Sequence, residues 1–462
     1  MTDTLMAALA SISGVGEFHP AGSEPFLAAE KRLLPFLGAR PDYVGLVRPG
    51  SAGELAAAVG FARMHKLAIL RLYNQSNVGA RLSGDGKALI IELGRMNRVL
   101  EVNADFAYAR VEPGVSFADL AAYLAQNNVP LLVDSGRDPD ASIAGSIFSK
   151  GFGYTPYGDH LLVQCGGEYV LPDGELLRTG MGAMADNRTW QLYKFALGPY
   201  SDGLAVQSDL MIPTQTGIWL MGQVPAFRAF ALDIDDDDTL AEVLEAARDF
   251  KIGNTLPGTL SIAHRDFDAL RSGTRPRKAA WRLYGALYGL PRVVEIGWDA
   301  VGAGLGRLRG VRLLGEEALA GDPLWQEQSA LMAGKPGVAA PRFAVGGFPA
   351  SAAMTFVSPI EGDAALKMLR SARVATPQGD LPFLTELAVL GRSLFQTVYL
   401  PYDPAQAKSV EGLASAGARL IEGMGGAGFG LASQSPEFNG LAIEQMKASP
   451  LNAIQRRLQK LI

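Results

Sequence analysis

The chain has 462 residues, more than a single hydrophobic core usually supports, so we expect at least two domains. Apolar residues make up 48% and charged residues 19%, as in a globular protein, and a net charge of −5 argues against a nucleic-acid partner, since phosphate binding needs a basic face. A single cysteine, Cys165, excludes an internal disulfide and cysteine-rich zinc or iron–sulfur sites, and it is typical of a reducing compartment.

The chain begins with a short apolar run at residues 5–9 that no Lys or Arg precedes. A secretory signal peptide starts with positive charge, so we expect a short helix packed on the body of the protein instead. No apolar stretch reaches the length that spans a bilayer. These features predict a cytoplasmic protein without a membrane partner.

Short strands then alternate with helices. Ser51 with Glu54 three residues later forms a capping box, and Ser116 precedes a second helical run. This alternation is typical of an α/β or α+β domain. The predicted strands are 43–48, 67–73, 88–93 and 107–114, and the predicted helices are 51–66 and 116–128.

A loop at residues 72–86 separates two of these strands and is dense in Asn, Gln, Ser and Gly. Its backbone N–H groups and small hydroxyls would suit a pyrophosphate, although an ordinary polar surface loop has the same composition. The chain has neither a GxGxxG fingerprint after a strand nor a Walker A lysine motif. A dinucleotide would therefore have to be held in another way.

Residues 151–160, GFGYTPYGDH, combine three glycines, a proline, two tyrosines, an aspartate and a histidine. Gly and Pro exclude a regular helix, so these side chains sit on a sharply turning backbone. Residues 161–180 that follow show a strand, a Pro-Asp-Gly turn and a returning strand, which predicts a hairpin. Residues 196–221 form another loop-rich stretch bordered by strands.

The sequence changes character after residue 222, where new strand–helix units begin and a second α/β domain is predicted. The acidic run 233–238 precedes a helix, whose N-terminal dipole favours carboxylates, and it lacks the spacing of a calcium-binding loop. A Gly/Pro-rich loop follows at 333–351, and a final helix is predicted at 449–462. No metal site is predicted.

Four segments together resemble the flavoproteins related to vanillyl-alcohol oxidase and para-cresol methylhydroxylase. They are 151–183, 197–221, 281–289 and 356–362, and they occur in the family's order. The resemblance implies an α+β fold with a two-subdomain FAD-binding domain and a cap domain built on an antiparallel sheet. The implied boundaries are 1–222 for the FAD-binding domain, 223–425 for the substrate or cap domain, and 426–462 for a C-terminal segment returning to the FAD-binding domain.

The same resemblance implies bound FAD, with GYTPYGDH wrapped around the flavin and the loop near residue 72 holding the pyrophosphate. Glycines at these positions let the backbone approach the cofactor. The implied cofactor-binding residues are Tyr73, Asn74, Gln75, Ser76, Asn77, Val78, Gly79, Pro113, Ser142, Gly145, Ser146, Gly153, Tyr154, Tyr157, Gly158, Asp159, Gly217 and Ile218.

The chain departs from the family at the positions that bind a phenolate. Members that oxidise para-alkylphenols use a tyrosine in the pyrophosphate loop, which would fall at Val78, and a Tyr-Arg pair near the C-terminus. That pair would fall at Ala432 and Ser433, or at Gly430 and Leu431 after a shift of two residues. An unpaired buried charge costs several kcal/mol, so we do not expect a typical para-alkylphenol as substrate.

A second departure concerns the covalent flavin link. The tethering histidine of vanillyl-alcohol oxidase would fall at Met354, and the tethering tyrosine of the cresol enzyme at Val345. We therefore expect noncovalent FAD, with a covalent bond elsewhere as the open alternative.

The family also keeps an aspartate near the flavin, about twenty residues before the aspartate of YGDH. Asp140 is its counterpart if a gap of about three residues is allowed, and Asp138 is the alternative. A carboxylate beside the flavin can act as a base or stabilise a developing cation. From the cap domain we expect polar contacts by Arg342, Gln396 and Tyr399.

These observations predict an FAD-dependent oxidase or dehydrogenase that removes a hydride from a small, mostly apolar organic molecule, either an alcohol or an activated C–H or amine. The electrons would pass to oxygen or to a protein acceptor, and we expect a homodimer. The alternative, from another class, is a non-catalytic or flavin-less partner subunit derived from such an enzyme, since the family's phenolate ligands are missing.

Overall fold

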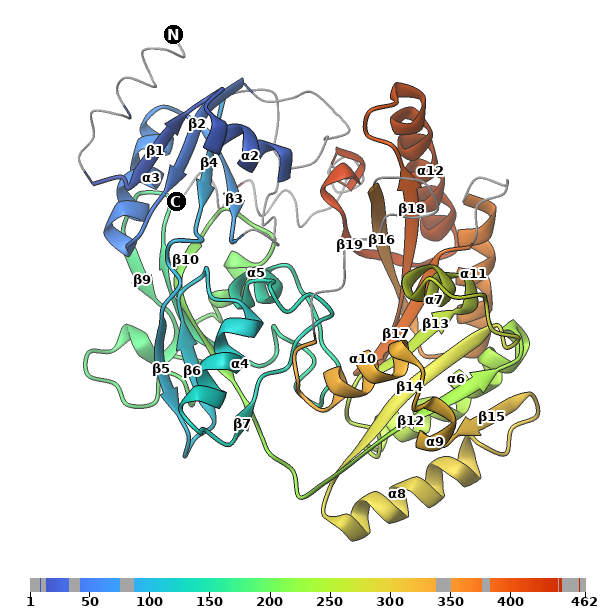
Figure 1. Ribbon diagram of the computed structural model, residues 1–462. Coiled ribbons are helices and arrows are strands. Elements are labelled where there is room, and N and C mark those ends of the chain that lie inside the picture. The colour runs from blue at the N-terminus through green and yellow to red at the C-terminus, as the bar shows by residue number, and fades with distance from the viewer. Residues whose placement is uncertain are drawn as a thin grey trace.

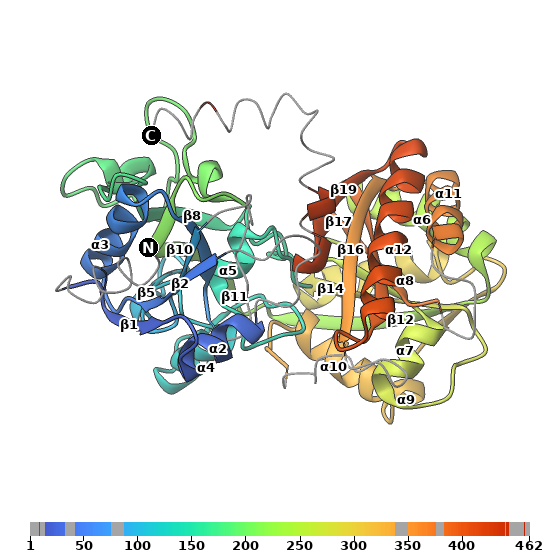
Figure 2. The same cartoon turned by 90° about the horizontal axis from the view of Figure 1, so that it is seen from above.

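A computed structural model of the protein describes residues 9, 14–32, 42–74, 87–337, 350–375, 383–438, 440–442 and 457. These residues form an N-terminal and a C-terminal domain that lie side by side, on the left and right of Figure 1 and again in the perpendicular view of Figure 2. None of the described helices is long and apolar enough to cross a membrane.

The N-terminal domain begins with a four-stranded sheet in the order β1-β2-β4-β3, in which β2, β4 and β3 are parallel and β1 is antiparallel to β2. Helix α2 packs on one face of the sheet and α3 on the other, so both faces are buried. The elements are β1 (Glu17–Pro20), α2 (Glu24–Arg32), β2 (Asp42–Arg48), α3 (Ala52–Met64), β3 (Ala68–Leu72) and β4 (Lys87–Glu92).

The predicted start of α3 is confirmed, but the carboxylate of Glu54 does not close the predicted capping box with Ser51. The Ser51 hydroxyl accepts a hydrogen bond from the Glu54 amide at 3.2 Å, as an N-cap residue does. The Glu54 carboxylate accepts the amide of Gly50 at 2.7 Å, one residue before the cap. The helix predicted after Ser116 does have the reciprocal capping box, which is formed by Ser116 and Asp119.

A five-stranded antiparallel sheet in the order β5-β6-β10-β8-β9 forms the other half of this domain. The predicted hairpin is β8–β9, and a separate two-stranded ribbon joins β7 to β11. One hydrophobic core joins both halves. The elements are β5 (Val99–Asn103), β6 (Tyr108–Val111), α4 (Phe117–Gln126), β7 (Leu131–Leu132), α5 (Ile143–Phe148), β8 (Gln164–Val170), β9 (Leu176–Arg178), β10 (Ile212–Trp219) and β11 (Met221–Gly222).

The C-terminal domain is built on an eight-stranded antiparallel sheet in the order β15-β12-β14-β13-β17-β18-β16-β19. The predicted α+β fold with an antiparallel-sheet cap is therefore confirmed. Strand β19 belongs to this sheet, so the segment expected to return to the first domain from residue 426 still runs through the cap. The strands are β12 (Ala226–Ile234), β13 (Leu260–His264), β14 (Trp281–Gly289), β15 (Val311–Leu314), β16 (Ala350–Pro359), β17 (Thr385–Leu390), β18 (Ser393–Tyr402) and β19 (Gly430–Gln434).

The two faces of the cap sheet are covered differently. Helices α6, α8, α11 and α12 pack on the outer face, away from the N-terminal domain, whereas α7, α9 and α10 pack on the inner face. Figures 1 and 2 show α11 and α12 on the far side of the sheet. The helices are α6 (Asp237–Ile252), α7 (Arg265–Ser272), α8 (Pro291–Gly304), α9 (Glu316–Leu319), α10 (Pro323–Met332), α11 (Gly362–Ala375) and α12 (Ala407–Gly426).

Strand β18 shows how side chains are shared between the two faces, because successive residues of a strand point to opposite sides. Leu394 and Val398 are fully buried in the core beneath the outer helices. Phe395 and Tyr399 are only half-buried and point to the inner face. This alternation decides which cap residues can face the N-terminal domain.

Candidate active site

Segments that the sequence assigns to the cofactor converge around the start of α5. The hydroxyl of Ser142 caps the helix by accepting the Gly145 amide at 2.9 Å, and it donates to the carbonyl of Pro113 at 2.6 Å. The side-chain amide of Asn74 donates to the carbonyl of Asp140 at 2.7 Å. These contacts join the start of the predicted pyrophosphate loop to the segments around residues 113 and 140.

The loop 151–160 folds into a tight turn against Asp134. The Gly153 amide donates to the carbonyl of Gly158 at 2.9 Å, and the carboxylate of Asp134 accepts the amides of Tyr154 and Thr155 at 3.1 and 2.6 Å. A Cβ atom at Gly153 would lie 1.6 Å from an oxygen of Asp134. Glycine is therefore required here by close approach.

A buried hydrogen-bonded chain underlies this loop and was not predicted. His160 Nε2 lies 2.8 Å from Asp134 Oδ1, and His160 Nδ1 lies 2.8 Å from the Ser146 hydroxyl on α5. The His160 and Asp134 side chains are 0% and 2% exposed, so substrate cannot reach these two, whereas Ser146 is half-buried. The chain of hydrogen bonds ties the loop to α5. Sequence reasoning had singled out Ser146 only as a cofactor-binding residue, and the histidine within GYTPYGDH was the other available signal.

The described residues fit a bound dinucleotide. The Tyr73 hydroxyl and the Thr216 hydroxyl are buried and have no hydrogen-bond partner among the described residues, and such groups in native proteins usually meet a ligand or water. Burial raises the pKa of Tyr73, so its phenol stays neutral. A Cβ atom at Gly114 would lie only 2.8–2.9 Å from three backbone carbonyl oxygens. The absence of a side chain at Gly114 therefore lets the chain pass this close to the neighbouring loop.

The remaining predicted cofactor residues are placed as follows. Tyr157 is half-buried, with its amide bonded to the Thr155 hydroxyl at 3.0 Å, and the carboxylate of Asp159 accepts the Leu162 amide at 3.0 Å. Gly217 and Ile218 lie within β10, where Ile218 belongs to the core. The pyrophosphate-loop residues Gln75, Ser76, Asn77, Val78 and Gly79 lie outside the described residues.

The loop expected to wrap the flavin also contacts the cap. Phe152 stacks on Phe395 of β18, with ring centroids 6.2 Å apart. Tyr154 belongs to a hydrophobic cluster of the cap's inner face that includes Tyr284 and Trp325. A substrate bound between this loop and the cap would therefore meet the inner face of the cap sheet.

That inner face carries a polar row across three neighbouring strands. Thr355 of β16 pairs with Thr397 of β18, and their hydroxyls lie 2.9 Å apart. Thr397 in turn is opposite Glu386 of β17. The Glu386 carboxylate accepts a hydrogen bond from the Tyr399 hydroxyl and another from Arg137 Nη1 at 2.6 Å.

Arg137 belongs to the N-terminal domain, so its ion pair with Glu386 crosses between the two domains. The side chains of Arg137 and Glu386 are only 16% and 14% exposed. Burial opposes ionisation of Glu386, but the charges of Arg137 and Arg271 and the hydrogen bond from Tyr399 together lower the pKa of the carboxyl below its usual value. The guanidinium also lies over the ring of Tyr154, 5.5 Å from its centroid. Sequence reasoning singled out neither Arg137 nor Glu386.

Of the four predicted catalytic residues, the three that the structure describes are not brought together. Asp140 and the alternative Asp138 are exposed, and Asp138 bonds the Asp140 amide at 3.1 Å. Gln396 is fully buried on the outer side of β18, where it donates to the Thr385 hydroxyl at 3.1 Å. Tyr399 alone points to the inner face, and Arg342 lies outside the described residues.

The positions compared with the family's tethering and phenolate-binding residues are also placed. Met354 is fully buried and belongs to the core beneath the outer helices, so it points away from the N-terminal domain. Ser433 on β19 is opposite Thr355 and is half-buried, and Ala432 lies beside it in the same strand. Val78 and Val345 lie outside the described residues.

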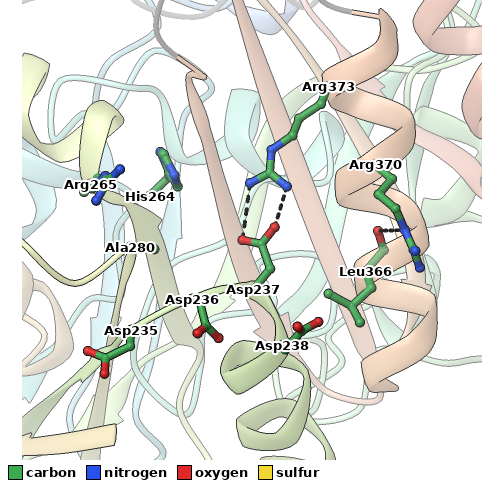
Figure 3. A pocket seen from close by; sticks show the side chains of 10 residues that line it. All are labelled: Asp235, Asp236, Asp237, Asp238, His264, Arg265, Ala280, Leu366, Arg370 and Arg373. Carbon is green, nitrogen blue, oxygen red and sulfur yellow. Dashed lines mark hydrogen bonds and ion pairs between the residues drawn. The ribbon is translucent and has the colours of Figure 1, made fainter. Parts of the chain in front are cut away.

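A pocket of about 530 Å³ opens elsewhere in the cap, where α6, α7 and α11 meet (Figure 3). Its acidic wall is the run that the sequence predicts as a helix cap: Asp236 caps α6, and Asp237 is ion-paired with Arg373 of α11. Burial lowers the pKa of His264 to about 4, so this wall histidine is neutral at pH 7. The lining residues all belong to the cap, and we assign this pocket no part in the flavin chemistry.

Comparison with known proteins agrees with this geometry. Residues 44–180 match the family described as FAD binding domain. The chain is 27% identical over 409 residues to the 4-cresol dehydrogenase [hydroxylating] flavoprotein subunit of Pseudomonas putida, covering 82% of this chain and 78% of that protein. It is 34% identical over 220 residues to the 1'-carboxy-chondrochloren decarboxylase of Chondromyces crocatus, covering 47% and 41% of the two chains.

Two solved structures resemble the whole chain. The 4-ethylphenol oxidase from Gulosibacter chungangensis, in complex with isoeugenol, superposes with a TM-score of 0.87 at 26% identity, covering 98% of this chain and 92% of that one. A p-cresol methylhydroxylase with substrate bound superposes with a TM-score of 0.78 at 24% identity, covering 91% and 92%. The predicted FAD cofactor is thereby confirmed.

Proposed function

We propose, from the premise that the chain belongs to the vanillyl-alcohol oxidase and para-cresol methylhydroxylase family of flavoproteins, that this FAD-dependent oxidoreductase removes a hydride from a small, uncharged, mostly apolar organic molecule. An alcohol, an amine in its unprotonated form or an activated C–H group fits this description, and a para-alkylphenol bound as its phenolate does not. When bound, FAD supplies the hydride acceptor.

The observation that carries the proposal is the charge balance of the cap's inner face. Among the described residues, each largely buried arginine at this face is ion-paired with a carboxylate of the protein. The cap supplies Arg271 with Glu327, Arg277 with Asp268, and Arg282 with Asp233 and Asp322, and the N-terminal domain supplies Arg137, paired with Glu386. A phenolate would need an uncompensated cation, because an unpaired charge in such surroundings is strongly unfavourable. A neutral substrate needs only hydrogen bonds and apolar contact.

The side chains for a neutral substrate are present on the same face. The paired hydroxyls of Thr355 and Thr397 can donate to and accept from a substrate hydroxyl. The stacked rings of Phe152 and Phe395 would cover its apolar part and exclude water. Tyr399 stays a candidate for orienting Glu386, and Asp140 stays a candidate base that would have to turn inward from its exposed position.

We also propose that FAD is held without a covalent bond. This is supported by Met354, which stands where a tethering histidine was expected and whose side chain is buried under the outer helices. Acid precipitation should leave a colourless pellet and a yellow supernatant. A flavin-bearing peptide detected by mass spectrometry would show that another residue forms the link.

We further propose that oxygen or a protein accepts the electrons, that the enzyme is cytoplasmic, and that it forms a homodimer. Light scattering of the purified protein tests the dimer, and stopped-flow reoxidation of the reduced flavin by oxygen tests the acceptor. Reoxidation slower than turnover would point to a protein acceptor.

The function itself is tested by anaerobic bleaching of the flavin band. The purified protein should be yellow, and a panel containing benzyl alcohol, benzylamine and para-cresol should reduce it at different rates. Faster reduction by a neutral alcohol or amine than by para-cresol is expected. A folded protein that never binds flavin would contradict the proposal and favour a partner subunit without turnover.

A further inference from the structure

Arg137 has the chemical features of an anion-binding residue. Its guanidinium is buried between the loop expected to wrap the flavin and the inner face of the cap sheet, over Tyr154 and next to Glu386. An arginine presents its N–H groups in a planar fork that matches a carboxylate or a phenolate oxygen. The anion found on Arg137 is a side chain of the protein itself, from a strand of the other domain.

The donors of Arg137 are only partly used. Nη1 donates to Glu386 at 2.6 Å and Nη2 to the Ser261 hydroxyl at a long 3.4 Å. The Nε group is buried without a hydrogen-bond partner among the described residues, and it lies 4.0 Å from Glu327 Oε1. Buried donors are usually satisfied, so an oxygen-bearing ligand or a water beside Nε would complete the set.

Glu386 is well held in its place. The Tyr399 hydroxyl donates to its other oxygen, and Tyr399 itself is stacked on Phe267 with ring centroids 4.8 Å apart. The strand register places Glu386 beside Thr397, in the polar row that the proposed substrate would meet. The carboxylate therefore lies between Arg137 and the remaining polar groups of this row.

We propose that Glu386 is a specificity-determining residue: it occupies the anion site that Arg137 would otherwise present, and so restricts this enzyme to uncharged substrates. This inference rests on the proposed function, because it takes the space between the flavin loop and the cap as the substrate site. A substrate anion would meet the negative charge of Glu386 and a cation that is already neutralised. Removing the carboxylate would leave a buried arginine that binds a small anion.

The test compares two probes of equal shape and different charge, benzoate and benzamide. Their dissociation constants are measured by isothermal calorimetry and by the difference spectrum of the bound flavin. Wild type should bind benzamide more tightly than benzoate. Glu386→Gln should tighten benzoate at least tenfold and change benzamide less than threefold.

Two further variants separate a specific effect from a general loss of charge. In the double variant R137Q/E386Q no cation is released, so benzoate affinity should return to the wild-type value. Glu101→Gln is the matched control, because Glu101 also accepts hydrogen bonds from a tyrosine and an arginine, Tyr108 and Arg110, and all three lie on β5 and β6 of the other domain. It should leave both constants unchanged.

A failure of this inference can be told apart from a failure of the proposed function. A wild-type protein without flavin would sink the proposed function, while calorimetry with the two probes would still test Glu386. Unchanged benzoate affinity in Glu386→Gln, or equal gains in R137Q/E386Q, would overturn the inference. Tighter binding of benzoate than benzamide by wild type would overturn it without any variant, even if Glu386→Gln failed to fold.

Glu386→Ala gives an independent readout on stability. Formate is small enough to take the place of the missing carboxylate, so it should raise the Tm of Glu386→Ala with saturation, and it should not do so for Glu101→Ala. A Tm that responds to formate equally in both variants would contradict the proposed anion site.

Discussion

The guanidinium of Arg137 and the carboxylate of Glu386 lie 2.6 Å apart although 249 residues separate them in the chain. Arg137 is in the loop between β7 and α5 of the N-terminal domain, and Glu386 is in β17 near the middle of the cap sheet. One buried ion pair thus joins the segment next to the predicted flavin loop to the surface that would hold substrate. The two domains are electrostatically coupled at the candidate site.

This coupling predicts a non-additive effect on stability. Removing one partner of a buried ion pair typically costs about 3–5 kcal/mol, because the other charge remains buried without compensation. Arg137→Gln and Glu386→Gln should each lower the Tm clearly, and R137Q/E386Q should lower it by less than the sum. Thermal unfolding of wild type, the two single variants and the double variant measures how strongly the two side chains stabilise each other. Strictly additive shifts in Tm would show that their interaction contributes nothing to stability.

The helix starts and the hairpin could be predicted from the sequence, because caps and turns are local signals. The α+β fold was implied by the family resemblance, whereas the local strand–helix pattern after residue 222 predicted an α/β domain and was wrong, since the cap sheet is antiparallel. The ion pair could not be predicted, since its partners are linked only by the tertiary fold. One prediction conflicted with a rule available from the sequence: Gln396 and Tyr399 are an odd number of residues apart on one strand, so they cannot both face the same side. The structure places Tyr399 inside and Gln396 beneath the outer helices.

The predicted aspartate beside the flavin shows a second limit. Aligning Asp140 with it required a gap of about three residues, and the structure leaves Asp140 exposed. The residue three positions earlier is Arg137, whose side chain does reach the space between the domains. Residue type pointed to Asp140 and position pointed to Arg137, and the fold turns Arg137 toward the cap while Asp140 faces solvent.

The buried chain Ser146–His160–Asp134 predicts that His160 controls flavin affinity. His160→Ala would leave Asp134 with an unpaired buried oxygen, at a typical cost of about 1–3 kcal/mol, and would loosen the loop 151–160 from α5. We expect the dissociation constant of FAD to rise at least tenfold, measured by flavin fluorescence. His65→Ala, at the half-buried end of α3, is the control and should leave FAD affinity unchanged.

Two glycines should respond in opposite ways to substitution by alanine. Gly153→Ala places a Cβ 1.6 Å from Asp134, so the loop must move and FAD binding should be lost or strongly weakened. Gly60→Ala lies in the interior of α3 with open space around the new Cβ, so it should stabilise the protein by about 0.5–1 kcal/mol through helix propensity. Retained flavin in Gly153→Ala would contradict the proposed role of this loop.

The ion pair also predicts how stability depends on pH. The folded-state pKa of Glu386 is lowered from 4.5, so the folded protein binds fewer protons than the unfolded chain in the acid range. The stability from this group is fully present above pH 4.5 and is lost as the pH falls below it. Tm measured between pH 3 and 7 should therefore fall less steeply on the acid side in R137Q/E386Q than in wild type. Parallel curves would show that Glu386 does not titrate with folding.

Simple para-alkylphenols should reduce the flavin slowly or not at all. A phenol ionises near pH 10, so holding it as phenolate at pH 7 needs selective stabilisation of about three pKa units, or roughly 4 kcal/mol. A neutral hydrogen bond contributes only about 1 kcal/mol, so the hydroxyls of Thr355, Thr397 and Ser433 cannot supply this alone, and the charge of Arg137 is taken by Glu386.

The measurement is the rate of anaerobic bleaching by para-cresol and by benzyl alcohol between pH 6 and 10. Because Glu386 already neutralises Arg137 in wild type, the para-cresol rate should stay low over this whole pH range, also where the phenol ionises in solution. In Glu386→Gln the released Arg137 should give a para-cresol rate that rises with pH from below the pKa of the free phenol, while the benzyl alcohol profile keeps its shape. Rapid bleaching of wild type by para-cresol at pH 7 would mean that a cation reaches the substrate there, and that the pocket is built for phenolates after all.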